Sequence, residues 1–168
     1  MRVLGLDMSS TCIGWCVIGD SAPVYGHHDL TGDIGARCAL ASYFVAKLLE
    51  AHETALVVIE SPVARYAKAV IPQARVSGAV LAVLADESAL WQEVAPAVAK
   101  RVLCGDGNAS KAQMVTAAAR RLGLDGDLTT IRGKVWWLDV APLLSEDEAD
   151  AYALALCGAA MRVVQVAA

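Results

Sequence analysis

The chain is 168 residues long, 57% apolar and 19% charged, which suits one domain with a substantial core and excludes extensive disorder. No apolar run reaches the roughly 20 residues that span a bilayer, and the start lacks a signal-peptide cleavage site, so a single-domain cytoplasmic protein with reduced cysteines is expected. The net charge of −4 argues mildly against nucleic-acid binding, although the charges are unevenly distributed.

The first half of the sequence predicts alternating strands and helices. Apolar runs at residues 3–6 and 56–59 are each followed by an acid and are typical of buried strands. Further strands are predicted at residues 12–18, at residues 24–28 as a sheet edge, and at residues 90–94, where Ala95-Pro96 stops the strand. Apolar residues at helical spacing predict helices over residues 37–49 and 72–85.

The last third is predicted to be helical. Capping boxes mark two helix starts, at Ser110 with Gln113 and at Ser145 with Glu148. The first helix should end at Gly123 and the second at about residue 163, and residues 124–144 between them are expected to be irregular. Strands followed by alternating strands and helices indicate a mixed α/β sheet.

Four acids are placed to converge at one edge of this sheet. Asp7 and Glu60 each follow an apolar strand, and neighbouring parallel strands end side by side, where ligand sites of open α/β sheets lie. Asp147 and Asp150 are three residues apart and share one face of the final helix. If that helix crosses the strand ends, the carboxylates must be protonated or bind metal, and hard oxygen ligands favour Mg²⁺ or Mn²⁺. A pair of such ions supports phosphodiester hydrolysis.

Each acid also has an explanation without a function. Asp7 can cap the turn after its strand, and an acid such as Glu60 is common after an apolar strand. Asp147 lies in the first helical turn, where the helix dipole favours acids. Asp150 lies deeper in the helix, between two alanines, so it is the more informative of the helical pair.

Basic residues concentrate in two stretches despite the acidic pI of about 5.3. Residues 61–85 carry three basic residues and no acid, and residues 99–134 carry seven basic residues against three acids. The second stretch includes Lys100 and Lys111. This distribution keeps nucleic-acid binding open as a function.

Four segments, in order, resemble the RuvC family of Holliday-junction resolvases: VLGLDMSSTCIGWCVI, VVIESPVARYAKAVIPQARVSGAVLAVLA, VAPAVAKRVLCGDGNASKAQMV and DEADAYALALC. The first contains Asp7, and the fourth contains the D-x-x-D-A core that begins at Asp147. Other positions in register with the family are Gly14, Gln73, Ala74, Arg75, Gly78, Lys100, Gly105, Gly107 and Lys111. The resemblance covers residues 1–123 and 145–160.

That resemblance implies a ribonuclease-H-like α/β fold with a mixed five-stranded sheet flanked by helices, and a homodimer that nicks branched DNA such as four-way junctions. It implies two Mg²⁺ ions, for which Mn²⁺ substitutes, bridged by Asp7 and flanked by the remaining acids Glu60, Asp147 and Asp150. Lys100 and Lys111 would contact phosphates near the cut, and Arg75 is a further expected DNA contact. The sequence does not indicate whether a motor protein acts together with this nuclease.

The chain departs from the family pattern in two places. Shortly after the second acid, where the family often has an aromatic residue that stacks on a junction base, this chain has Val63, and Tyr66 is the nearest candidate for stacking. Residues 124–144 form a longer stretch than expected and carry Trp136 and Trp137, of which one should be buried because adjacent strand residues point to opposite faces. These differences suggest a divergent member, such as one encoded by a phage.

Other functions share some of these features. A RuvC-like nuclease of RNA processing shares the first strand motif, but the basic loop and the D-x-x-D-A helix favour the resolvase. A non-catalytic junction-binding dimer has no use for four acids beside phosphates. A sugar-kinase or actin-like ATPase needs two such domains, for which 168 residues are too few. His27 and His28 are expected at the surface of the edge strand, without a metal-binding role.

Overall fold

A mixed five-stranded sheet forms the centre of the computed structural model, which describes residues 2–61, 67–124, 129–131, 134–136 and 144–166. The strands are β1 (Val3–Met8), β2 (Cys12–Ile18), β3 (Val24–Asp29), β4 (Leu56–Glu60) and β5 (Trp91–Val94). They lie in the order β3-β2-β1-β4-β5, in which β1, β4 and β5 are parallel and β2 runs antiparallel to β1 and β3. The predicted mixed five-stranded sheet, with β3 at one edge, is confirmed.

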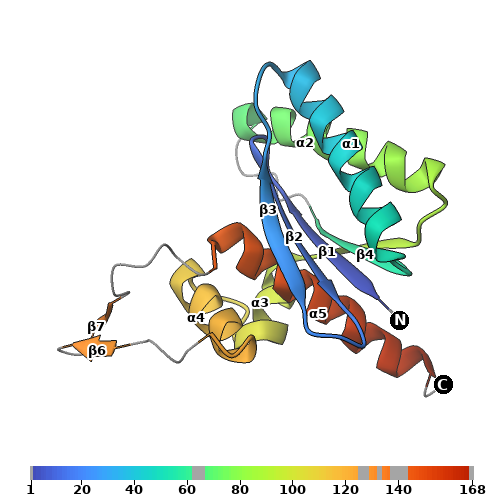
Figure 1. The fold of residues 1–168 in the computed structure, drawn as a ribbon. Coiled ribbons are helices and arrows are strands. Elements are labelled where there is room, and N and C mark those ends of the chain that lie inside the picture. The colour runs from blue at the N-terminus through green and yellow to red at the C-terminus, as the bar shows by residue number, and fades with distance from the viewer. Residues whose placement is uncertain (1, 62–66, 125–128, 132–133, 137–143, 167–168) are drawn as a thin grey trace.

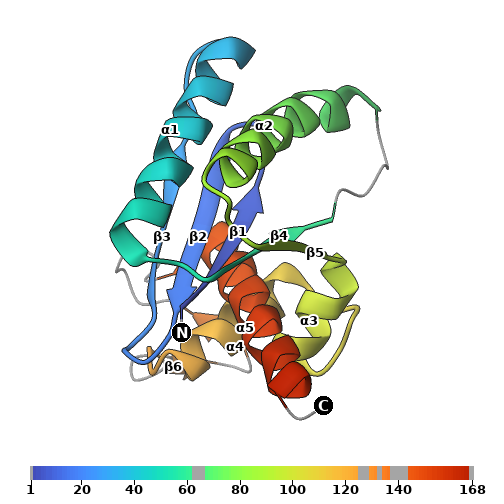
Figure 2. The same ribbon diagram turned by 90° about the vertical axis from the view of Figure 1, so that its right-hand side faces the viewer.

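Helices cover both faces of the sheet (Figure 1 and Figure 2). One face carries α1 (Ile34–His52) and α2 (Ala67–Asp86), and the other is crossed by α5 (Glu146–Val166), beside α3 (Pro96–Cys104) and α4 (Lys111–Arg121). Leu4 and Leu6 pack with residues of α1 and α2, whereas Val3 and Cys16 pack with residues of α5. Because strand side chains alternate between faces, Asp7 points to the same face as Val3, toward α5.

Helix α5 approaches the sheet closely because small residues line the contact. A methyl group added to Gly14 would lie 2.2 Å from the carbonyl oxygen of Asp147, and one added to Gly5 would lie 2.1 Å from that of Ala151. Gly158 makes a similar approach to side chains of β1 and β4. The helix buries a run of alanines, which are Ala149, Ala151, Ala153 and Ala155. At Gly5 and Gly14, the helix backbone therefore rests directly on the strand backbone.

Three helices differ from the expectation. Helix α1 begins three residues earlier, at Ile34, because the Asp33 carboxylate caps it by accepting a first-turn N–H at 2.9 Å. Helix α2 begins at residue 67, so Pro72 lies inside it and removes one backbone hydrogen bond. Helix α3 was not predicted, because Pro96 suggests a strand stop; in the structure it starts the helix, where its missing N–H has no partner to lose.

The expectation of an irregular stretch at 124–144 is partly wrong. Strands β6 (Thr129–Ile131) and β7 (Lys134–Trp136) pair as a two-stranded antiparallel sheet within it. Trp136 ends β7, and Trp137 lies outside the described residues, as does Val63 near the second acid.

Both predicted capping boxes are confirmed, at the starts of α4 and α5. Gly123 has a φ of +71°, the left-handed conformation that commonly follows a helix end, as predicted. All five cysteines carry free thiols. Among the described helices, none has the length and apolar character needed to cross a bilayer.

Replacing Gly14 with alanine should displace the start of α5, because the added methyl group would overlap the Asp147 backbone. We expect the free energy of unfolding to fall by about 2–3 kcal/mol, as for a severe overpacking defect. The control is Gly78→Ala in α2, where an added methyl group meets no atom within 4 Å; alanine there should stabilise by about 0.5–1 kcal/mol. Chemical denaturation measures both variants, and a fully stable Gly14→Ala protein would contradict the close contact.

Candidate active site

Asp7 and Glu60 lie beside each other at the ends of β1 and β4. These strands run parallel with Leu6 beside Ile59, so the next position in the register pairs the two acids. Both side chains are partly buried and point to the face of the sheet that α5 covers. The predicted convergence of the two strand ends is therefore present in the fold.

The start of α5 brings Asp147 and Asp150 to the same place. Its first turn is fixed by the capping box, in which the Ser145 hydroxyl accepts the Glu148 N–H at 3.2 Å and the Glu148 carboxylate accepts the Ser145 N–H at 2.6 Å. All four acids line one cavity of about 400 Å³, whose other lining residues are Met8, Ser9, Gln73, Pro96, Ala99, Lys100, Lys111 and Met114.

Burial and repulsion from neighbouring acids disfavour the charged forms of Asp7, Glu60 and Asp150. Burial is the main cause that raises the pKa of Asp7 to about 8, followed by repulsion from Asp150, Glu60 and Asp147. The pKa values of Glu60 and Asp150 are also raised, first by burial. Asp7 is thus the acid whose pKa is raised by all three of the others. A cation among such carboxylates would favour their charged forms.

The donor set suits a hard divalent cation. Four carboxylates present only oxygen atoms, which Mg²⁺ and Mn²⁺ prefer as ligands. In the part of the chain that the structure describes, no three acidic, histidine or cysteine side chains are already gathered as tightly as the ligands of one ion. Because like charges repel, a cation would have to draw the carboxylates closer together than they stand.

Two lysines line the same cavity: Lys100 from α3 and Lys111 from α4. Both favour the charged forms of Glu60 and Asp150 and so oppose the effect of burial on their pKa values. Lys111 Nζ also lies 2.9 Å from Glu146 Oε2, and both side chains are more than half exposed. Two lysines beside a carboxylate cluster can bind the phosphate oxygens of a substrate that enters the cavity.

Arg75, a predicted site residue, does not line the cavity, and Gln73, which does, was not among the predicted site residues. Arg75 lies exposed on α2, outside the lining, and Tyr66 lies outside the described residues. Gln73 was not predicted as a site residue, yet its Nε2 donates to the Met8 carbonyl at 2.9 Å and ties α2 to the end of β1. The available signal was an amide on the helix face that also carries the buried Val76.

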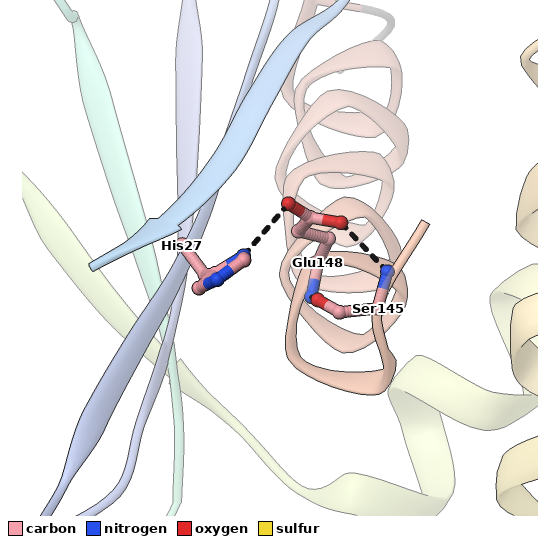
Figure 3. A network of polar contacts seen from close by, with 3 residues as sticks. All are labelled: His27, Ser145 and Glu148. Carbon is pink, nitrogen blue, oxygen red and sulfur yellow. Dashed lines mark hydrogen bonds and ion pairs between the residues drawn. The ribbon is translucent and has the colours of Figure 1, made fainter. Parts of the chain in front are cut away.

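His27 on β3 was expected only at the surface, and its side chain is 48% exposed. Figure 3 shows its ring beside Glu148, with Nδ1 3.0 Å from Oε1, while the other carboxylate oxygen accepts the Ser145 N–H. The hydrogen bond to Glu148 is the main cause that raises the pKa of His27. His28 points to the opposite face of the sheet, where it stacks on Phe44 with ring centres 4.3 Å apart.

Comparisons with known proteins identify a family and a shared fold. The family model described as crossover junction endodeoxyribonuclease RuvC matches residues 3–132. Thermus thermophilus RuvC is similar at 22% identity, with a TM-score of 0.73 and with 98% of this chain and 97% of that chain covered. A structure of T. thermophilus RuvC in complex with a Holliday junction substrate gives 18% identity, a TM-score of 0.74, and coverage of 98% and 96%.

A more distant solved structure is the yeast mitochondrial Holliday junction resolvase Ydc2. It shares 15% identity, with a TM-score of 0.61 and with 92% of this chain and 77% of that chain covered. None of the curated proteins compared by sequence matches the chain. The structural likenesses confirm the predicted fold class.

Asp7→Asn should stabilise the metal-free protein at neutral pH. The pKa of Asp7 is about 8 when folded against an ordinary 3.8, so the folded state binds more protons and stability falls as pH rises between these values. Asparagine folds without the proton uptake that Asp7 requires, so we expect a gain of about 1–3 kcal/mol near pH 7 that disappears near pH 4. Thermal unfolding in chelator measures it, with Asp86→Asn at the exposed end of α2 as the neutral control. Equal midpoints for Asp7→Asn and wild type at neutral pH would contradict the raised pKa of Asp7.

Proposed function

This chain belongs to the RuvC family of crossover junction endodeoxyribonucleases, and we propose that it resolves four-way DNA junctions by metal-dependent phosphodiester hydrolysis. The observation that carries the proposal is one cavity in which Asp7, Glu60, Asp147 and Asp150 meet two lysines. Carboxylates supply metal ligands and lysines supply phosphate contacts, so both needs of the reaction are met at one place.

The four carboxylates would hold a pair of divalent cations, Mg²⁺ or Mn²⁺. When bound, such a pair activates a water for attack on phosphorus and stabilises the leaving oxygen. The protein's part is to hold the ligands: Gln73 fixes the Met8 carbonyl beside Asp7, and the capping box fixes the helical turn that carries Asp147 and Asp150. Hydrogen bonds of this supporting kind commonly set how well a metal site binds.

Lys100 and Lys111 would bind the phosphates on either side of the cut. Such contacts position the DNA and carry no sequence information. Arg75, exposed on α2, would bind backbone phosphates outside the cavity. Base stacking by Tyr66 stays a prediction.

The substrate class and a homodimer are parts of the same proposal. The solved complex of T. thermophilus RuvC with a Holliday junction substrate supports a four-way junction as the substrate. Such a junction has two strands related by twofold symmetry, and a homodimer presents two identical sites with that symmetry. A RuvC-like nuclease of RNA processing and a non-catalytic junction-binding dimer are the alternatives to test against it.

Asp7→Asn should abolish nicking of a mobile four-way junction while leaving junction binding in chelator intact. The substitution removes the acid whose pKa is raised by all three of the others, and it leaves both lysines in place. We expect a loss of at least about 10³-fold in rate, as when a main catalytic group is removed. Gel-based nicking with Mg²⁺ and a binding titration in chelator measure the two properties, and Asp86→Asn is the matched control. Full nicking by Asp7→Asn would contradict the proposed metal site.

A panel of substrates separates the alternatives. Wild-type protein is incubated with a four-way junction, a flap, a linear duplex and a structured RNA, each with Mg²⁺, Mn²⁺ or chelator. Symmetric paired nicks on the junction support both the substrate and the dimer. Preferential cutting of the RNA would favour the processing nuclease, binding without cutting would favour the scaffold, and cutting in chelator would remove the role of metal.

Glu146→Gln should tighten junction binding, because it releases Lys111 from its ion pair. An exposed pair is worth about 0.2–1 kcal/mol, so we expect up to about a fivefold gain in affinity at low salt that fades as salt screens it. Glu87→Gln, an exposed acid outside the cavity, controls for the change in net charge. Weaker binding by Glu146→Gln alone would show that Glu146 instead holds Lys111 in its DNA-binding position.

A further inference from the structure

One row of residues runs across the sheet beneath the start of α5. Asp7 on β1 pairs with Gly14 on β2, and Gly14 pairs with His27 on β3. Side chains at paired positions point to the same face, so Asp7 and His27 flank the glycine on the face that α5 covers. The backbone of Asp147 lies directly over Gly14. The helix start therefore sits in a gap with an acid on one side and a histidine on the other.

The two flanks act on the helix start in opposite directions. On the Asp7 side, Asp147 and Asp150 line the same cavity as Asp7, and their charges add to burial in disfavouring a charged Asp7. On the other side, Glu148 is attached to β3 through His27 Nδ1 at 3.0 Å. Glu148 is only 12% exposed, so this contact is better shielded from solvent than an ordinary surface pair. An attachment on one flank can hold the helix in place against repulsion on the other.

Glu148 links this attachment to the metal-binding turn. Its Oε2 accepts the Ser145 N–H while its Oε1 faces His27, so one carboxylate joins the capping box to the sheet edge (Figure 3). Asp147 is the neighbouring residue in the same turn. A shift of Glu148 would move the Asp147 backbone over Gly14, where there is no spare room.

We propose that His27 is a positioning residue, which holds Glu148 and thereby keeps Asp147 in place for divalent-cation binding. This inference rests on the proposed function, since it assigns His27 to the support of that metal site. His27 does not line the cavity, so we expect it to contact neither the substrate nor the cation. Its effect should appear in metal affinity and not in DNA affinity.

The test compares Mn²⁺ binding to metal-free protein, measured by calorimetry or by the electron paramagnetic resonance of free Mn²⁺. His27→Ala should weaken Mn²⁺ binding by about five- to tenfold, at the low end for a residue that supports a metal ligand. His27→Asn should restore most of the affinity, because its amide nitrogen occupies nearly the position of Nδ1. His28→Ala is the matched control, since that neighbour faces α1 and should leave Mn²⁺ affinity unchanged.

Two further measurements exclude a general loss of structure. Junction affinity in chelator should be nearly the same for His27→Ala and wild type, and the thermal midpoint in chelator should fall by only about 2–4 °C, as expected for the loss of one hydrogen bond. Nicking by His27→Ala should require more Mg²⁺ for half its maximal rate but approach the wild-type rate at saturating Mg²⁺. In a Glu148→Ala background, His27→Ala should have no additional effect on Mn²⁺ affinity, because the residue through which it acts is gone.

The outcomes distinguish this inference from the function on which it rests. If wild-type protein binds no Mn²⁺ in an Asp7-dependent way, the proposed metal site fails first. If wild type binds and nicks as proposed but His27→Ala binds Mn²⁺ equally well, the positioning role is wrong while the function stands. Equal losses of metal affinity, junction affinity and thermal stability would also overturn it, since they indicate only a structural role.

Discussion

The contact between α5 and the sheet is the constraint on which the site depends. Gly5 and Gly14 have no side chains, so the helix backbone lies directly on the strands, and buried alanines keep the contact thin along its length. Any larger residue at either glycine would lift the helix and carry Asp147 and Asp150 away from Asp7. The two glycines thus determine how close the helical acids lie to Asp7.

Electrostatic repulsion between the acids of α5 and those of the strands opposes that contact. Three consecutive acids at the start of α5 differ in how their charges are compensated. Glu146 pairs with Lys111 on one side, and Glu148 pairs with His27 on the other. Asp147, between them, faces the cavity. The outer two acids each have a cationic or proton-donating partner, and only the middle acid is left to face the cavity, where the proposed metal site lies. Functional sites commonly depart from local stability in this way.

The mixed α/β sheet and the acids could be predicted from local patterns: apolar strands followed by Asp7 and Glu60, and a capping box that starts the helix of Asp150. The ribonuclease-H-like arrangement of that sheet was predicted from the family resemblance. What could not be predicted depends on tertiary contacts. Gln73 acts through a carbonyl far away in sequence, and His27 acts through a register between strands that no local pattern reveals. Helix α3 was missed because a proline after a strand is equally consistent with a stop and with a helix start.

The order of the elements along the chain adds a consequence for synthesis. The cavity joins residues of the first strand to residues of the last described helix, with the central strand β1 made first. A growing chain on the ribosome carries the strand acids without the helix acids, and contacts between such distant segments also form late in folding. The carboxylate cluster therefore assembles only after α5 has been made and has packed against the sheet, so a chain that ends before α5 carries only half of it.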